Sequence, residues 1–457
     1  MENFLTNFVN MTRSSFSRQA TFNWFVVVFI GFICRGDFLG VSSIIRALDL
    51  CPSNYECLLH FFHSSAWKGD ELLLRCVKWL KETGLIVKRN GKIVINGDET
   101  KTPKEGRRMP WVGSIRQTSE TSSKPSYFRG HEWAMLGVLI GIGNRLFCAP
   151  AWASIMKPGV SGTPSPRTTG IVNAAGELAA KLESTAYLVL DAFYAVGPVF
   201  IAAAKAQNIT IITRAKSNCK AHVLAKEVKN KKRGRPRIYE YAVKIKDLFE
   251  VKKFKTFPVQ IYGKTEEVKI YTTALFWKVA QANILFVLAE TSRGKITLMC
   301  SNIKESPVDV LELYCSRSLI EVMFDRLKNL LGVMQYHFWS QSIKPQSRRP
   351  SKNLPNKIDT PSIKAKKEAI SNFVHIGLVV LLFLQAVACK FKGSVTNVAD
   401  CWLRTSPREI PSEFIVKIAL TKVLGGFIRC SASNAIMKII NAKKRTQPPD
   451  KESQLAA

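Results

Sequence analysis

The first 90 residues carry apolar side chains at helical spacing. The segments GVSSIIRALDL, NYECLLHFFH and GDELLLRCVKWLKETG repeat apolar residues three and four positions apart, which predicts amphipathic helices. Ser53 and Asn54 suit a helix start, and Gly84 suits a helix end. We therefore predict a helical region over residues 1–90. Several short helices on a basic chain favour a helix-turn-helix DNA-binding region, and a plain helical bundle fits almost as well.

From residue 92 short apolar runs replace this spacing and predict strands. Asn90-Gly91, between LIVKR and KIVIN, predicts a two-residue hairpin turn. Strands are expected at residues 92–97, 133–143, 145–156, 186–192 and 209–215, with helices at 168–184, 197–207 and 306–332. This order predicts an α/β fold in which helices pack on a mixed sheet.

Two segments interrupt that order. Residues 216–303 contain short β-rich pieces such as FPVQIYG and NILFVLAE, which predict an inserted β-rich domain between core parts 91–215 and 304–339. Residues 340–367 are rich in Pro, Ser and Lys and predict a basic linker or mobile loop. A helical C-terminal region over 368–441 and a polar tail over 442–457 complete the organisation.

The charge of the chain points to a polyanionic partner. The 457 residues hold 67 Lys plus Arg against 34 Asp plus Glu, a net charge of +33. Neutralising phosphates releases counterions, so nucleic acid is the natural partner, although acidic membrane surfaces attract the same charge. At 46% hydrophobic residues the chain can also bury a substantial core.

Membrane spans and metal-binding cysteines are not expected. The apolar run at residues 22–34 is short for a bilayer, and the run at 373–389 contains His375 and Gln385, which favours a buried helix. Eleven Cys without C-x-x-C pairs or zinc-finger spacing predict reduced, mostly buried thiols. We expect a soluble, cytoplasmic protein with no membrane partner.

Three acids suit a metal-dependent reaction on phosphodiesters. Asp98 and Asp191 end predicted strands, and Glu321 lies on the helix predicted to pack against them. Three carboxylates without Cys or His favour Mg²⁺ or Mn²⁺. Two such ions per site can activate an attacking oxygen and stabilise the leaving oxygen.

A four-residue signature gives this site a family resemblance. Tyr314-x2-Arg317-x3-Glu321-x6-Lys328 places four polar side chains on one helical stripe. It resembles the Tyr/Arg/Glu/Lys signature of bacterial insertion-sequence DDE transposases. The segments NGDETKTPKEGRRMP and YLVLDAFYA are similar to the surroundings of their first and second catalytic Asp. In three-dimensional terms the resemblance implies an RNase H-like core with an inserted β-domain.

The resemblance also implies an activity, partners and roles. It implies cut-and-paste transposition of double-stranded DNA: nicking at the terminal inverted repeats, a hairpin intermediate, and strand transfer into target DNA. Asp98, Asp191 and Glu321 would be catalytic and metal-binding, while Tyr314, Arg317 and Lys328 would contact the transposon end. A homodimer in the DNA complex and a location at the bacterial nucleoid follow from the same likeness.

Several residues have competing interpretations. Glu99 rivals Asp98, although strand alternation sends the two to opposite sides. Glu312 and Asp325 rival Glu321 but break the signature, and Glu321 could simply pair with Arg317. His131 could be a ligand or a base, but a hydrogen-bonded structural residue is the favoured interpretation. Further DNA contacts are expected from Lys101, Lys104, Arg107 and Arg108. Arg214 and Asn218 could contact the DNA end, and structural pairing fits them as well. In the A·T-hook-like KNKKRGRPR, Arg233 and Arg235 could contact DNA, with a solvated basic loop as the alternative.

Two other functions remain compatible with the sequence. A catalytically silent or domesticated transposase would bind DNA without metal-dependent nicking. A purely hydrolytic RNase H-like nuclease would nick DNA without joining strands.

Overall fold

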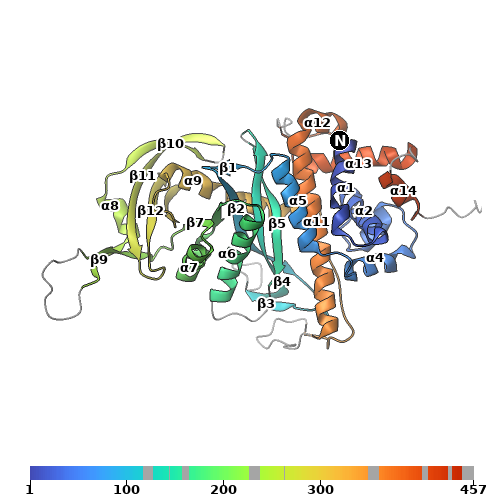
Figure 1. Ribbon diagram of the computed structural model, residues 1–457, viewed down its shortest axis with the longest axis horizontal. Helices are drawn as coiled ribbons and strands as arrows, with labels where there is room; N and C mark the ends of the chain where they lie inside the picture. Colours follow the sequence, from blue (N-terminus) through green and yellow to red (C-terminus); the bar gives the residue numbers. More distant parts are fainter. Residues whose placement is uncertain are drawn as a thin grey trace, which may run out of the picture.

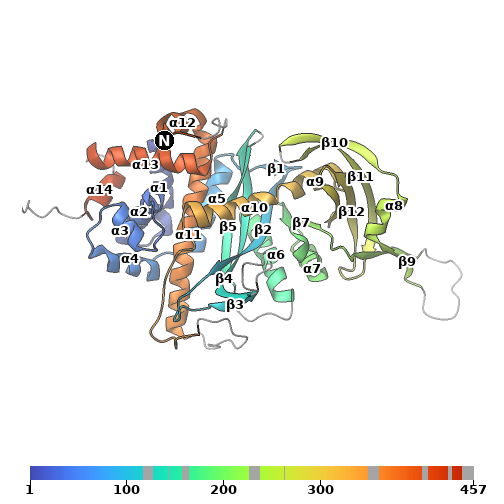
Figure 2. The same ribbon diagram turned by 180° about the vertical axis from the view of Figure 1, so that it is seen from behind.

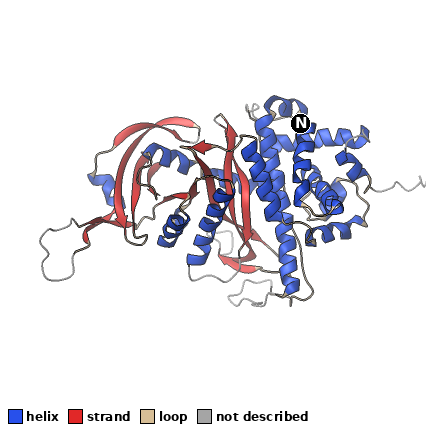
Figure 3. Ribbon diagram, in the orientation of Figure 1, coloured by secondary structure: helices blue, strands red, loops and turns tan. Residues whose placement is uncertain are grey.

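The computed structural model describes residues 1–116, 127–143, 145–156, 164–225, 237–261, 263–347, 360–403, 410–430 and 435–444. Figure 1 shows a helical body at one end of the molecule and a β-rich part at the other. The sheet between them carries helices on both faces, as the colouring by secondary structure in Figure 3 makes clear. The predicted α/β class is confirmed at this level.

Helices from both ends of the chain form the helical body. Its N-terminal elements are α1 (Glu2–Thr12), η1 (Arg13–Ser15), α2 (Gln19–Cys34), α3 (Ser42–Ala47), α4 (Asn54–His63) and α5 (Gly69–Glu82). Its C-terminal elements are α11 (Pro361–Lys390), α12 (Lys392–Ala399), α13 (Glu413–Cys430) and α14 (Ala435–Asn441). Helix α11 packs against α2, α4 and α5, and α2 also contacts α13 and α14. The predicted helices are confirmed, while a DNA-binding role for residues 1–90 stays a prediction.

Helix α11 forms the centre of this body. Among the described residues it is the one helix long and apolar enough to cross a bilayer, yet its most apolar 18-residue window is 100% buried within the protein. The rings of Phe373 and Phe383 pack at steep angles against Phe32 and Phe29 of α2, with ring centroids 5.1 and 5.6 Å apart. This is the packing of a core helix, as His375 and Gln385 led us to expect.

The start of α11 corrects the predicted linker. Thr360 Oγ1 accepts a hydrogen bond from Ile363 N at 3.3 Å, and Pro361 occupies the first helical position. Both features favour a helix start. Residues 361–367 are therefore helical and not part of a linker.

One sheet joins all the described strands. They are β1 (Lys88–Arg89), β2 (Lys92–Pro103), β3 (Gly113–Arg116), β4 (Tyr127–Ile142), β5 (Arg145–Ile155), β6 (Ala186–Leu190), β7 (Ile209–Arg214), β8 (Lys220–Leu224), β9 (Tyr239–Lys244), β10 (Lys255–Ile261), β11 (Lys264–Trp277), β12 (Ala282–Thr291) and β13 (Gly294–Cys300). Their order is β3-β4-β2-β6-β7-β13-β12-β11-β8-β9, with β1 beside β2, β5 beside β4 and β10 beside β11.

The centre of the sheet holds three parallel strands. β2, β6 and β7 run parallel, while β4 is antiparallel to β2 and β5 is antiparallel to β4. Helices α6 (Pro164–Lys181) and α7 (Gly197–Ala206) cover one face; α9 (Pro307–Cys315) and α10 (Ser318–Asp325) cover the other (Figures 1 and 2). Strand β6 is buried along its whole length, which explains its unbroken apolar sequence.

The segment 216–303 is β-rich, as predicted, and its sheet is continuous with the core. β13 pairs antiparallel with β7, from Leu298 opposite Arg214 to Cys300 opposite Ile212. Besides strands β8 to β13, the segment contains η3 (Ile245–Asp247) and α8 (Leu248–Val251). Its status as a separate inserted domain stays a prediction.

The hairpin between β1 and β2 forms where the sequence predicts it. Asn90 and Gly91 have φ of 49° and 76°, the positive values that a tight turn with two left-handed residues requires. Lys88 and Arg89 pair with Ile93 and Lys92 across this turn. Elsewhere, the ten cysteines with described side chains form no disulfide with one another.

Candidate active site

Two of the predicted acids stand level on neighbouring parallel strands. The last paired residues of β2 and β6 are Asn96 and Val189, so two residues further along Asp98 is level with Asp191. The register between β6 and β7 brings Arg214 level with Asp191 in the same way. Neighbouring strands lie about 4.8 Å apart. Asp98, Asp191 and Arg214 therefore form one row across three strands, which we call the acid row.

The face of β2 that carries Asp98 meets the helices of the signature. Asn96 Nδ2 donates to the carbonyl of Ser316 at 2.8 Å, and Asp98 Oδ2 accepts from Arg317 at 3.2 Å. Alternation along a strand puts Asn96 and Asp98 on this face and Glu99 on the other. The contact with Arg317 thus favours Asp98 over its neighbour.

Asp98 is held in a partly desolvated environment. Burial raises the pKa of its carboxyl to about 6; the hydrogen bond from Glu99 N to Oδ1, at 2.8 Å, opposes this rise. Repulsion from Asp191 adds to the rise, and attraction to Arg317 opposes it. The carboxyl is therefore an acid whose negative charge is incompletely compensated.

Local hydrogen bonds fix Asp191 at the end of β6. Its Oδ1 accepts from Phe193 N at 2.8 Å and caps the 3-10 turn η2 (Ala192–Tyr194). Its main-chain carbonyl accepts from Thr213 Oγ1 on β7 at 2.6 Å. The chain turns away from the sheet here, and the carboxylate remains at the strand end where the sequence pattern predicts it.

The helix predicted over 306–332 is divided. Helix α9 ends at Cys315, α10 begins at Ser318, and a π-helical turn, η4 (Arg326–Leu330), follows α10. The backbone of Ser316 and Arg317 stays in the right-handed helical region, so the stretch continues across the break. Figure 2 shows α9 and α10 following one another along the same face of the sheet.

Serine hydroxyls bond to the backbone where α9 and α10 are divided. Ser316 Oγ donates to the carbonyl of Leu313 at 2.6 Å, and Ser318 Oγ donates to the carbonyl of Cys315 at 3.2 Å. Such bonds compete with the helical backbone pattern. Arg317 N accordingly bonds to the carbonyl three residues back, at 3.1 Å, as in a tighter turn.

Arg317 bridges the strand and the helix of the site. One guanidinium nitrogen lies 3.2 Å from Asp98 Oδ2 and another lies 2.6 Å from Glu321 Oε1. The side chains of Arg317 and Asp98 are 19% and 21% exposed, while that of Glu321 is 59% exposed. Burial lowers the pKa of Arg317, but Glu321 and Asp98 outweigh it and raise the pKa. The guanidinium is a fixed cation between two of the three predicted acids.

The donor types fit a divalent metal, but the acids are not gathered around one point. Three carboxylates suit Mg²⁺ or Mn²⁺, and a cation would relieve the repulsion between Asp98 and Asp191. Within the described ranges, no three His, Cys, Asp or Glu side chains form a group that could hold a metal ion. The guanidinium of Arg317 lies between Asp98 and Glu321 instead. Shared coordination by these two acids would require it to withdraw.

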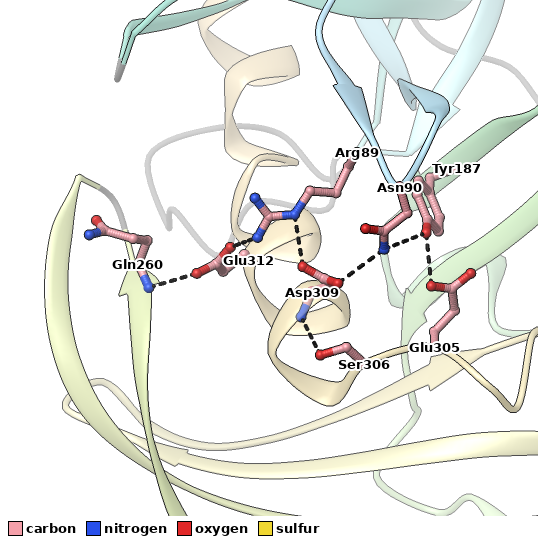
Figure 4. A network of polar contacts seen from close by, with 8 residues as sticks. All are labelled: Arg89, Asn90, Tyr187, Gln260, Glu305, Ser306, Asp309 and Glu312. Carbon is pink, nitrogen blue, oxygen red and sulfur yellow. Dashed lines mark hydrogen bonds and ion pairs between the residues drawn. The ribbon is translucent and has the colours of Figure 1, made fainter.

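A polar network anchors α9 to three parts of the sheet (Figure 4). Arg89, at the β1–β2 hairpin, forms ion pairs with Asp309 at 2.8 Å and with Glu312. Glu312 also accepts from Gln260 N of β10 at 3.0 Å. Because Glu312 is engaged here, it is a positioning residue rather than a rival of Glu321.

The same network reaches the buried core strand β6. Asn90 Nδ2 donates to Asp309 at 3.0 Å, and the hydroxyl of Tyr187 donates to Glu305 at 2.8 Å. Lys92 pairs with Glu305 at 2.7 Å. The hairpin tip, β6 and the helix start are therefore linked by charged hydrogen bonds, which sets the position of the signature helix. The other rival acid, Asp325, accepts locally from Arg326 and Asn329, at 2.8 and 2.7 Å.

The remaining signature residues lie along the same stretch. Tyr314, on α9, is half-buried beside the core. Lys328, in η4, donates to the carbonyl of Lys101 at 3.0 Å, and Lys101 in turn donates to the carbonyl of Arg116 at 3.0 Å. Their expected DNA contacts stay predictions.

The structure corrects the expected DNA contact of Lys104. Its amine is buried under the ring of Tyr336, 3.6 Å from the ring centre, and donates to the carbonyls of Met334 and Tyr336. Burial lowers its pKa to about 7. It cannot meet a phosphate from this position. His131 is structural, as predicted, because its two ring nitrogens contact Tyr336 Oη and the Pro110 carbonyl, both at 2.7 Å.

Other predicted DNA contacts differ in accessibility. Arg107 is exposed and donates to the carbonyl of Gln346 at 3.0 Å, whereas Arg108 is half-buried. Arg214 is exposed at the end of β7. Arg233 and Arg235 lie outside the described residues.

Two residues at the site were missed by sequence reasoning. Asn96 is fully buried and ties β2 to the break between α9 and α10. Tyr194 is 1% exposed, and burial, together with Glu99, Asp98 and Asp191, raises the pKa of its hydroxyl above the ordinary range. Asn96 lies two residues before Asp98, so strand alternation places it on the same face, and this signal was available in the sequence. For Tyr194 the sequence held no signal beyond its position three residues after Asp191.

The parallel strands of the core place Asp98 and Asp191 level with each other, and Arg317 pairs with the third acid, Glu321. These features define a candidate site for cleaving phosphodiesters. The family model of the DDE superfamily endonucleases matches residues 13–256, and the chain belongs to that family. It is thus a transposase-like endonuclease, with DNA as the substrate that this family implies. The matched residues include Asp98 and Asp191, whereas Glu321 lies beyond them.

Other comparisons are distant. No curated protein matches the chain. Among solved structures, the chain is similar to the NurA nuclease from Sulfolobus solfataricus, at 8% sequence identity over 59% of this chain and 86% of that one. The TM-score is 0.23, a likeness too remote to carry an argument.

Proposed function

We propose that this endonuclease is a DNA transposase that cleaves the ends of an insertion sequence and joins them to target DNA. The observation that carries the proposal is the level placement of Asp98 and Asp191 opposite the Arg317–Glu321 stretch. The order β5-β4-β2-β6-β7, with the last three parallel, supports an RNase H-like core. The signature Tyr314, Arg317, Glu321 and Lys328 supports the transposase class by resemblance.

Asp98, Asp191 and Glu321 would hold two divalent metal ions, Mg²⁺ or Mn²⁺. When bound, these ions activate an attacking oxygen and stabilise the leaving oxygen of a phosphodiester. Arg317 would exchange its carboxylate partners for a phosphate, which a guanidinium can bind with two parallel hydrogen bonds. Asn96 and the network around Arg89 keep the helix in place during this exchange.

The substrate and assembly follow the same proposal. Terminal inverted repeats would bind along the signature stretch, with Tyr314 and Lys328 near the end of the DNA, and target DNA would enter afterwards. Two chains would hold two ends, so the active complex is a homodimer on DNA. A hairpin at the cleaved end is the expected intermediate.

The test is a cleavage and strand-transfer assay with Mg²⁺ on DNA carrying the element's own ends. Asp98→Asn, Asp191→Asn and Glu321→Gln should each abolish nicking and joining, whereas the matched control Asp325→Asn should keep both. Full activity in one acid variant rejects that assignment. Nicks without joined strands would indicate a hydrolytic nuclease, and binding without nicking a silent DNA-binding protein.

A further inference from the structure

A basic hollow opens beside the acid row. It has a volume of about 750 Å³ and lies where the loop after β7 meets η3, α8 and β13. Ala192 and Arg214 line it on the core side. Ala192 follows Asp191 directly, and Arg214 is level with Asp191 in the sheet. The hollow therefore begins where the acid row ends.

Positive charge from separate segments converges on this hollow. Arg214 and Lys216 come from the end of β7 and its loop, Lys246 from η3 and Lys295 from β13. All four side chains are exposed. One acid, Glu250, also lines the hollow, so cations outnumber anions on its walls.

Most of these cations have no anionic partner. Among the described residues, Arg214, Lys216 and Lys246 form no salt bridge, and Lys295 approaches Glu290 at 3.5 Å in an exposed pair. Exposed pairs of this kind are weak. Like charges held close together repel one another, so an external anion would stabilise this arrangement.

The hollow also offers an aromatic wall. The ring of Phe249 is half-buried, and the ammonium of Lys295 lies 5.3 Å from its centre. Amide and hydroxyl groups of Asn218 and Ser217 complete the polar lining. Cations that track a phosphate backbone beside an aromatic face are the features of sites for unpaired nucleic-acid strands. A hollow of this volume lies within the range of pockets that hold small ligands.

We propose that this hollow binds the phosphodiester backbone of a short unpaired DNA strand that leaves the acid row. The proposal rests on the proposed function, since it assigns a place to the strand next to the cleaved phosphodiester. Arg214 would meet the first phosphate beside Asp191, and Lys216, Lys246 and Lys295 would meet those that follow. The β-rich segment 216–303 thereby gains a role in substrate binding.

The experiment measures equilibrium binding of a fluorescent single-stranded oligonucleotide by anisotropy, in EDTA and over a range of KCl concentrations. A triple variant of the hollow, called the groove variant, combines Lys216→Gln, Lys246→Gln and Lys295→Gln. Its matched control combines Lys78→Gln, Lys205→Gln and Lys264→Gln, which remove the same charge from exposed lysines elsewhere. Thermal melting of each variant verifies that it is folded.

The groove variant should bind the single strand about tenfold more weakly, and the slope of log affinity against log salt should fall by about 2, as expected for three lost contacts. In the control variant, the changes in affinity and in salt slope should each be less than half of those in the groove variant. Equal losses in both variants would overturn the proposal, as would a groove variant whose losses are the same for a duplex. Because no metal is present, this result is independent of whether wild-type protein cleaves DNA.

Discussion

The acid row and the basic hollow lie side by side at one end of the core sheet, and they handle charge in opposite ways. Beside the acid row, Arg317 pairs with Asp98 of the row and with Glu321 of α10. In the hollow, Arg214, Lys216 and Lys246 are exposed and form no salt bridge within the described part of the chain, although Glu250 also lines the hollow. A site whose carboxylates already hold a cation must be opened by its ligand. An uncompensated site attracts its ligand from solution.

The largest effect should come from removing the compensation. Arg317→Ala frees Asp98 and Glu321, so the two acids lose the cation that pairs with them. We expect Mn²⁺ affinity, measured by electron paramagnetic resonance, to rise about tenfold, while DNA cleavage falls about 100-fold because the phosphate loses its donor.

A matched control exists for this variant. Arg89 also bridges two carboxylates, Asp309 and Glu312, away from the acid row. Arg89→Ala should leave Mn²⁺ affinity within about twofold of wild type, since Asn90 and Gln260 N still donate hydrogen bonds to Asp309 and Glu312. Unchanged or weaker Mn²⁺ binding by Arg317→Ala would show that the guanidinium does not compete with metal.

Lowering the pH should weaken metal-dependent cleavage at the acid row and leave DNA binding in the hollow unchanged. The pKa of Asp98 is raised to about 6, so its carboxyl gains a proton as the pH falls through that value and loses its affinity for a cation. Mg²⁺-dependent cleavage should fall about tenfold per pH unit below about 6. Metal-free binding of single-stranded DNA should change little over the same range. A flat cleavage profile between pH 7 and 5 would contradict this.

The same carboxyl should cost stability at neutral pH. Its folded pKa of about 6 exceeds the ordinary value of 3.8, so the folded state binds the proton more tightly. The resulting stabilisation is complete below about pH 4 and is lost as the pH rises through 6. Without metal, Asp98→Asn should therefore raise the free energy of unfolding at pH 7 by about 1 kcal/mol, after loss of the Arg317 contact is allowed for.

Chemical denaturation at pH 7 and pH 4 measures this difference. The gain should vanish at pH 4, where both proteins carry an uncharged group. An Asp98→Asn protein that is less stable than wild type by the same amount at both pH values would exclude the explanation.

The smallest effect is expected in the hollow. Lys216→Gln and Lys246→Gln remove exposed charges with no partner, so each should change the free energy of unfolding by less than about 0.5 kcal/mol. Urea unfolding at low and high salt measures it. A loss above about 1 kcal/mol would mean that these lysines support the fold rather than a ligand.

Short stretches of sequence predicted the strands and the turn that position the site. The hairpin at Asn90-Gly91 follows from backbone freedom at two residues, and the strand ending at Asp191 follows from an unbroken apolar run. The parallel order of β2, β6 and β7 then brings Asp98 and Asp191 level. These features depend on neighbours along the chain or on simple sheet geometry, which a sequence carries directly.

Features set by distant contacts were not predictable in the same way. The burial of Lys104 depends on Tyr336, more than 200 residues away along the chain. The pairing of β13 with β7 and the bridge from Arg317 to Asp98 depend on how separate segments meet. The break near Ser316 had a local cause, but serines inside helices commonly leave the backbone intact, so the sequence alone did not reveal it.

The most direct test of the central claim is a crystal structure with Mn²⁺ and a DNA end, with anomalous scattering to locate the ions. We expect Mn²⁺ to be bound by Asp98, Asp191 and Glu321, with the guanidinium of Arg317 moved from the carboxylates to a phosphate. Mn²⁺ absent from these three acids, with Arg317 still bridging Asp98 and Glu321 in the DNA complex, would contradict it.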